Sequence, residues 1–212
     1  MVSYLGHYPD ARKKPIEGFI RAVKSFINQD LKESELIIVA DGCQLTKDLY
    51  ELHFSEETRI RFFMQPKTDG WPGLHRQFGI QQSRYDLITY LDSDDAIGPQ
   101  RLSGLVSAIG QKPYVVDKLY TIPVAEFPAR KYSPIGKTKF EEIDFWIFRP
   151  TWMGGTYQFC HRKIGAQWTN TKVRGEDAKF LKSLQSIQMV KDPFIEVGQY
   201  FVCHHPKWGW DV

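Results

Sequence analysis

Three carboxylates lie within four residues of one another, at Asp92, Asp94 and Asp95. Carboxylates at this spacing repel one another unless a cation lies among them. Mg²⁺ is usually held by one or two carboxylates together with substrate phosphates, and such an ion would neutralise a diphosphate leaving group as a Lewis acid. A solvated turn or the start of a helix is the simpler alternative, because Asp and Ser favour such positions. Since the cluster directly follows an apolar segment, residues 87–91, metal binding is the better interpretation.

The segments that must position this cluster alternate between strand and helix in the first half of the chain. Residues 16–28 place apolar side chains at helical spacing, and residues 74–84 also have a helical pattern. Short apolar runs predict four strands, at residues 2–8, 35–40, 60–64 and 85–91. Buried strands that alternate with helices favour a parallel sheet covered by helices on both faces.

Polar residues stand at the ends of several predicted strands. Tyr8 ends the first strand, Asp41 follows the second, and the acidic residues 92–95 follow the fourth. In sheets of this kind, ligands bind beyond the carboxyl ends of the strands. We therefore expect these three distant positions to converge on one crevice.

The alternation of strand and helix fades in the second half of the chain. Residues 113–150 are rich in Pro, Lys and aromatic residues, which predicts irregular structure with short strands. A further strand is expected at 156–161 and a helix at 176–187. Because no internal repeat and no convincing linker interrupts the chain, we expect one domain across residues 1–212.

Bulk properties argue against several classes of protein. The net charge of +3 over 212 residues makes no case for a nucleic-acid-binding surface. The cysteines Cys43, Cys160 and Cys203 follow neither CxxC spacing nor a disulfide pattern, so a reducing compartment is expected. The N-terminus lacks the layout of a signal peptide, and no apolar run approaches the roughly 20 residues of a membrane-spanning helix. We expect a cytoplasmic protein without a transmembrane segment; peripheral membrane contact through a partner and the oligomeric state stay open.

The acidic cluster is one of an ordered set of motifs. Leu-Asp-Ser-Asp-Asp at 91–95, followed by Pro99 and Arg101, resembles the DxD segment of family 2 glycosyltransferases with a GT-A fold. Other segments resemble that family in the same order: residues 3–8 its opening strand, 26–29 the helix end Ser-x-Leu-x-Gln, 36–42 the strand Ile-Val-Asp-Asp-Gly-Ser, 73–79 the helix Gly-x-x-x-Ala-Arg-Asn-x-Gly, and 175–177 the xED motif. The likeness spans most of residues 2–187.

This resemblance implies a GT-A, Rossmann-like fold, with a mostly parallel sheet flanked by helices and a smaller acceptor-side region. Residues 1–112 would form the nucleotide-sugar-binding half and residues 113–212 the acceptor-binding half. The chain departs from the family pattern at His7 and Pro9 around Tyr8, at Ala40 in place of an Asp, and at Gln77 in place of an Asn. It also lacks a Gln-x-x-Arg-Trp segment, so it resembles processive polysaccharide synthases poorly.

The resemblance implies a metal site built on the acidic cluster. Asp94 would be the main ligand of Mn²⁺ or Mg²⁺, Asp92 would assist at the metal or at the donor ribose, and Asp95 would be structural. A late histidine often completes the metal site of the GT-A fold, and imidazole is a good ligand. His204 and His205 are the candidates, with His205 preferred, and a pair of loop histidines without a metal is the alternative.

The resemblance also assigns residues to the nucleotide-sugar donor. Asp41 would contact the nucleobase or the ribose, and Tyr8 would stack on the base. Arg76 would bring positive charge close to the donor. Each assignment has a simpler alternative, because Asp41 also suits an Asp-Gly turn and Arg76 also suits an exposed helix surface.

A second acidic pair, Glu176 and Asp177, opens the predicted helix 176–187. A hydroxyl acceptor must lose its proton as it attacks the anomeric carbon, and an aligned carboxylate can accept that proton. The resemblance favours Asp177 as this general base, with Glu176 beside it. Acidic residues also collect at helix N-termini because the helix dipole favours them. Direct displacement by the hydroxyl would invert the anomeric configuration.

Together these features predict a metal-dependent glycosyltransferase. UDP is the favoured donor nucleotide because it is common in the family, and a glycan or lipid-linked acceptor is expected. A nucleotidyltransferase is a first alternative, although residues 5–14 lack the Gly-rich phosphate loop of that class. A non-catalytic nucleotide-sugar-binding protein is a second alternative.

Overall fold

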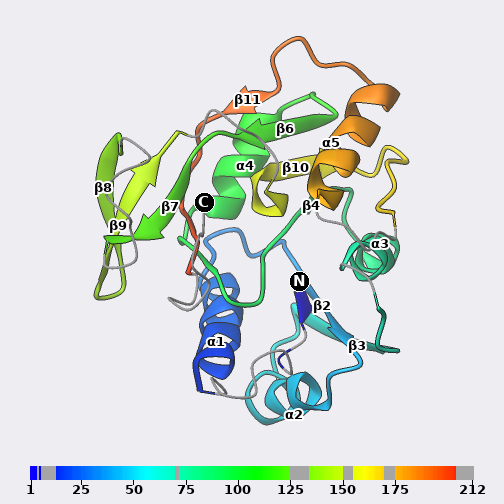
Figure 1. The fold of residues 1–212 in the computed structure, drawn as a ribbon, viewed down its shortest axis with the longest axis vertical. Helices are drawn as coiled ribbons and strands as arrows, with labels where there is room; N and C mark the ends of the chain where they lie inside the picture. The colour runs from blue at the N-terminus through cyan, green and yellow to red at the C-terminus, as the bar shows by residue number, and fades with distance from the viewer. Residues whose placement is uncertain are drawn as a thin grey trace.

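The first strands of the chain form a parallel sheet (Figure 1). The computed structural model describes residues 1–3, 5, 13–69, 72–124, 134–149, 155–169 and 175–203. The sheet consists of β1 (Val2–Ser3), β2 (Leu36–Asp41) and β3 (Ile60–Gln65), in that order. Strands β2 and β3 are in register along their full length, so that Asp41 lies opposite Gln65 at the carboxyl edge.

Helices cover both faces of this parallel sheet. They are α1 (Lys13–Ile27), α2 (Gln44–His53) and α3 (Gly73–Gln82). Successive side chains of a strand point to opposite faces. Ile38 of β2 therefore joins a buried cluster with Phe19 of α1 and Leu49 of α2, whereas Val39 lies against Gly79 of α3.

The second sheet is mixed and combines strands from distant parts of the chain. Its order is β11 (Phe194–Ile195), β6 (Tyr114–Asp117), β10 (Phe159–Arg162) and β4 (Leu87–Thr89). Strand β10 runs antiparallel to both of its neighbours. Two helices pack on opposite faces: α5 (Glu176–Ile187) places Phe180 beside Phe159, and α4 (Arg101–Ile109) places Leu105 beside Cys160.

The third sheet brings the end of the described chain next to the acidic cluster. Its order is β5 (Ala96–Ile97), β12 (Tyr200–Phe201), β7 (Tyr120–Pro123), β9 (Ile143–Phe148) and β8 (Gly136–Phe140). Because β12 pairs with β5, Tyr200 lies opposite Ile97, just after the acidic residues 92–95. Strands β8 and β9 form a hairpin at the outer end of this sheet (Figure 1).

The predicted α/β class is confirmed, with corrections to its extent. The predicted strand 85–91 is only Leu87–Thr89, and it pairs with the antiparallel β10 rather than joining the parallel sheet. Residues 113–150 contain the short strands that were expected there, β6 to β9. Helices α2 and α4 were not predicted. Among the helices of the described residues, none combines the length and the apolar character that crossing a bilayer requires.

A buried ion pair joins α4 to the second sheet. The Arg101 guanidinium donates to the Asp117 carboxylate and, at 2.7 Å, to the carbonyl oxygen of Gly198. Asp117 also accepts hydrogen bonds from the backbone N–H groups of Gly198 (2.9 Å) and Leu119 (3.0 Å). Both charged side chains are at most 2% exposed. Each charge therefore depends on the other, because an uncompensated charge in the interior is strongly unfavourable.

Replacing Arg101 with Leu is expected to destabilise the protein by about 3–5 kcal/mol, because Asp117 would stay buried without its partner. Urea unfolding followed by circular dichroism measures the change. The double variant Arg101→Leu/Asp117→Leu is the control and should recover part of the loss. A single variant as stable as the wild type would contradict the importance of this pair.

Candidate functional site

Arg76 of α3 lies at the centre of a cluster of acidic side chains. One guanidinium nitrogen, Nη1, donates to Oε1 of Glu176 at 2.5 Å and lies 3.7 Å from Oδ1 of Asp177. The other, Nη2, donates to Oδ1 of Asp92 at 3.2 Å. The Arg76 side chain is only 11% exposed. Three elements that are far apart in the sequence, α3, the segment after β4 and the start of α5, therefore meet at one cation.

Glu176 ties the start of α5 to the start of α3. Its Oε2 accepts the backbone N–H of Gly73 at 3.2 Å, while its Oε1 accepts from Arg76. A Cβ atom at position 73 would lie 2.7 Å from the carbonyl oxygen of Thr169 and 3.0 Å from Glu176. Glycine at this position therefore permits the close approach of the two helix starts.

Asp177 is the more accessible acid of the pair. Its side chain is 28% exposed, against 5% for Glu176. The Thr156 hydroxyl donates to its Oδ1 at 2.5 Å. Burial raises the pKa of Asp177, although the nearby Arg76 guanidinium acts in the opposite direction. A carboxyl group with these properties is suited to accept a proton.

The Arg76 guanidinium packs on a stack of aromatic side chains. The guanidinium lies 5.0 Å from the ring centroid of Trp168, and that ring stacks on Phe180 at 4.1 Å. The Trp168 indole donates to the Tyr90 hydroxyl at 2.9 Å, and this hydroxyl lies 2.8 Å from Nε2 of His161. Sequence reasoning missed Trp168, because it stands in an irregular segment with no periodic pattern that would mark it.

The cluster after β4 carries concentrated negative charge. Burial and the neighbouring Asp92 carboxylate raise the pKa of Asp94 to about 6. Burial and the neighbouring carboxylates of Asp94 and Asp92 also hold the pKa of Asp95 well above its usual value. Asp95 accepts hydrogen bonds from the Tyr200 hydroxyl (2.9 Å) and from the Cys203 backbone (2.8 Å). These bonds tie the cluster to β12.

Helix α1 holds the same cluster from the other side. The Arg21 guanidinium donates to the backbone carbonyl oxygen of Asp94 at 2.6 Å. A Cβ atom at Gly18 would lie 3.2 Å from Cα of Asp94, so the helix passes very close to this turn. The backbone around Asp94 is therefore fixed by contacts that do not use its carboxylate.

The chemistry of Asp92 and Asp94 fits a hard divalent ion. A dication would offset the repulsion and burial that raise the pKa of Asp94. In the part of the chain that the structure describes, no group of three or more His, Cys, Asp or Glu side chains is placed to hold a metal. Substrate phosphates and water would therefore have to complete the coordination. His204 and His205 lie outside the described residues, so their role at a metal stays a prediction.

Asp41, at the end of β2, is held by three hydrogen-bond donors. They are Nζ of Lys67 (2.6 Å), the backbone N–H of Thr68 (2.8 Å) and Nε2 of His75 (2.7 Å). Burial acts to raise the pKa of Asp41, but these bonds outweigh it and leave the pKa below its usual value. His75 directly precedes Arg76 in α3, so Asp41 and the acidic cluster are held by neighbouring residues.

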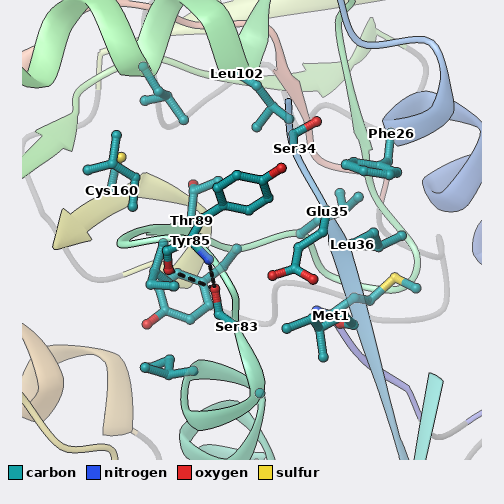
Figure 2. Close-up of a pocket in the computed structure, with 18 of the residues that line it drawn as sticks. Met1, Phe26, Ser34, Glu35, Leu36, Ser83, Tyr85, Thr89, Leu102 and Cys160 are labelled. Atoms are coloured by element: carbon teal, nitrogen blue, oxygen red, sulfur yellow. Dashed lines mark hydrogen bonds between the residues drawn. The ribbon is translucent and has the colours of Figure 1, made fainter. Parts of the chain in front are cut away.

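A cavity of about 300 Å³ separates β1 from β4. Figure 2 shows Phe26, Leu36 and Leu102 among the apolar side chains around it. Polar lining residues such as Glu35 and Ser83 precede β2 and β4, at the amino ends of these strands. The lining also includes His75, Arg76 and Asp92, so the cavity extends from these amino ends to the candidate site.

The structure brings together most of the residues singled out from the sequence. Arg76 contacts Asp92, Glu176 and Asp177 directly. Asp41 contacts His75, the residue that precedes Arg76 in α3. Asp94 follows Asp92 in the same turn. Tyr8, like His204 and His205, lies outside the described residues. Lys67, Thr68, His75, Thr156 and Trp168 were not predicted, and their contacts join segments that the sequence separates.

Comparison with known proteins identifies the family. The sequence model of the protein family Glycosyl transferase family 2 matches residues 17–171. The chain belongs to glycosyl transferase family 2. The matched range contains Arg76, Asp92 and Asp94 but ends before Glu176 and Asp177, so the acidic pair at the start of α5 rests on the geometry above.

Individual relatives of this family 2 chain match parts of it. GalNAc(5)-diNAcBac-PP-undecaprenol beta-1,3-glucosyltransferase of Campylobacter jejuni is 31% identical over 93 residues, which is 43% of this chain and 29% of that protein. An uncharacterized glycosyltransferase of Haemophilus influenzae is 30% identical over 83 residues, 39% of this chain and 33% of that protein. The match thus spans about a third or less of these curated relatives.

The fold is similar to that of S. aureus TarS, residues 1–349. The TM-score is 0.65 at 13% identity, covering 95% of this chain and 58% of that one. A structure of the same TarS segment in complex with UDP-GlcNAc gives a TM-score of 0.64 at 13% identity, over 90% and 56% of the two chains. These likenesses confirm the GT-A-type architecture.

The buried His161, which contacts Tyr90, is expected to make the free energy of unfolding depend on pH. Burial lowers its pKa from 6.5 to about 4. The unfolded chain therefore binds a proton between these values that the folded protein does not, so stability falls as pH decreases from 6.5 towards 4. Lowering the pH from 7.5 to 5 is expected to cost about 2 kcal/mol through this residue.

Urea unfolding at pH 7.5 and 5 measures this loss in the wild type and in His161→Gln. Gln lacks a titrating group but keeps an oxygen that can accept from Tyr90. The variant should therefore lose about 2 kcal/mol less than the wild type over this interval. Equal losses in the two proteins would contradict the assignment to His161.

Proposed function

We propose that this chain is a metal-dependent glycosyltransferase that transfers a sugar from a UDP-sugar to a hydroxyl of a glycan or lipid-linked acceptor. The observation that carries the proposal is the gathering of Asp92, Glu176 and Asp177 around Arg76. Membership of family 2 supports the reaction class. The complex of TarS with UDP-GlcNAc supports a UDP-sugar donor, and the undecaprenol-linked substrate in the name of the C. jejuni relative supports a lipid-linked acceptor.

On the donor side, Asp41 would bind the nucleobase at the end of β2, with Tyr8 as the proposed stacking residue. Asp92 and Asp94 would hold Mn²⁺ or Mg²⁺, and His205 is the proposed third ligand. When bound, the ion stabilises negative charge on the departing diphosphate. Arg76 keeps the surrounding carboxylates in place and limits their mutual repulsion.

On the acceptor side, Asp177 would act as the general base. Both oxygens of Glu176 are already bonded, to Arg76 and to Gly73, which favours a positioning role for that residue. The acceptor hydroxyl would pass its proton to Asp177 as its oxygen bonds to the anomeric carbon. The bond from that carbon to the diphosphate breaks in the same step, with the electron pair leaving on the nucleoside diphosphate. Such a direct displacement inverts the anomeric centre.

The setting of the reaction is proposed on two observations. The buried Cys43 and Cys160 are free thiols, which supports a reducing compartment and a cytoplasmic location. The second and third sheets both combine strands from either side of residue 112. This interleaving supports one domain, with donor binding centred on residues 1–112 and acceptor binding on residues 113–212.

A binding experiment tests the donor and the metal. UDP with Mn²⁺ at 100 times its Kd is expected to stabilise the folded protein by about 2.7 kcal/mol, because the ligand binds only the native state. Differential scanning fluorimetry measures the shift in Tm, with EDTA in place of Mn²⁺ as one control. Asp94→Asn should lose most of the metal-dependent shift, whereas the exposed Glu142→Gln should retain it. A shift that is independent of both metal and Asp94 would contradict the proposed site.

Asp177→Asn is expected to lower kcat by about 10²- to 10⁴-fold, because the amide cannot accept the acceptor proton. Donor affinity should change little, since Asp177 is assigned to the acceptor. In the wild type, kcat should rise with pH as Asp177 loses its proton, and its raised pKa places this rise above the range of an ordinary Asp. NMR of the product reports the anomeric configuration; a retained centre, or full activity of the variant, would rule out this mechanism.

A further inference from the structure

The two oxygens of the Asp41 carboxylate have unequal surroundings. Oδ1 accepts two hydrogen bonds, from the Thr68 backbone N–H at 2.8 Å and from Nε2 of His75 at 2.7 Å. Oδ2 accepts one, from Nζ of Lys67 at 2.6 Å. Each carboxylate oxygen offers about two lone-pair positions. Oδ1 is therefore saturated, and Oδ2 can accept one further hydrogen bond.

His75 is well placed to maintain this asymmetry. Its side chain is 4% exposed and that of Asp41 is 9% exposed, so water competes little for their contact. The lowered pKa of Asp41 keeps the carboxylate ionised, and an ionised carboxylate only accepts hydrogen bonds. Nε2 of His75 must therefore carry the proton. Helix α3 packs against β2, and the bond from His75 to Asp41 joins these two elements.

Nucleobases differ in the number of N–H donors that they present to a carboxylate. The pairing edge of guanine presents two adjacent N–H donors, on N1 and N2, which a carboxylate binds with both oxygens. The pairing edge of uracil presents one N–H donor, on N3, between two carbonyl oxygens. A carboxylate with one available oxygen can satisfy uracil but leaves a guanine donor without a partner, and an unsatisfied buried donor is unfavourable.

We propose that His75 is a positioning residue that sets the base specificity of the donor site, because it saturates Oδ1 of Asp41 and thereby favours uracil over guanine. The inference rests on the proposed function, in which Asp41 binds the base. Oδ2, which accepts from Nζ of Lys67 at 2.6 Å, is the oxygen that remains for the base.

Isothermal titration of UDP and GDP, each with Mn²⁺, tests this role in the full chain. The wild type should bind UDP more tightly than GDP. In His75→Leu, Oδ1 gains a vacant lone-pair position, and the preference for UDP should shrink by about 10- to 100-fold, the range of a bidentate base contact. His75→Gln places an amide donor near the original Nε2 position and should keep the wild-type preference.

The ratio of the two dissociation constants separates this role from a merely structural one. A general disturbance of the site would weaken UDP and GDP binding alike and leave the ratio unchanged, which would overturn the inference while the proposed function stands. A wild type that binds neither nucleotide would instead overturn the proposed function. If His75→Leu does not fold, His75→Asn takes its place, because the shorter amide does not reach Asp41, and the same change in ratio is expected.

Discussion

The site depends on one buried guanidinium that faces three carboxylates. Arg76 is only 11% exposed, and a cation in such a place needs compensating charge. Asp92, Glu176 and Asp177 supply that charge from the segment after β4 and from the start of α5. The same contacts hold these acids together despite their repulsion. The ion pairs between Arg76 of α3 and the acids of α5 therefore hold the two helices in position relative to each other.

Burial and hydrogen bonding give similar acids different roles. Glu176 and Asp177 are neighbours at the start of one helix, yet Glu176 bridges Arg76 and Gly73 while Asp177 stays partly exposed. In the cluster after β4, Asp95 is bonded to Tyr200 and Cys203, whereas the Asp92 side chain is 38% exposed. In the sequence these residues are all simply acidic. Only their surroundings in the folded protein distinguish a structural carboxylate from one that can react.

Helix α3 links the two ends of the proposed donor site. His75 bonds to Asp41 at the end of β2, and the next residue, Arg76, bonds to the acids of the reaction centre. Consecutive helix residues point about 100° apart, so one turn can serve both groups. In the family pattern given above, an Ala precedes this Arg, and an Ala side chain has no donor for Asp41.

The sequence alone determined the elements whose pattern is local. Helix 176–187 was predicted and found as Glu176–Ile187, and the strand predicted at 60–64 was found as Ile60–Gln65, because apolar periodicity and turn residues report which face of a segment is buried. The ordered motifs also led to family 2, to Arg76 and to both acidic groups. Helix α4 had the same kind of signal, at Leu102, Leu105 and Ile109, and was overlooked.

Only the tertiary structure decided which segments meet. The antiparallel pairing of β4 with β10, the Trp168 ring under Arg76 and the bond from Thr156 to Asp177 join residues that no local pattern relates. The saturation of one oxygen of Asp41 likewise needs Thr68 and His75 to reach the end of β2 from later in the chain. Periodicity specifies that a side chain is buried, but its partner is chosen by the packing of the whole chain, since the free energy of a contact depends on both groups at once.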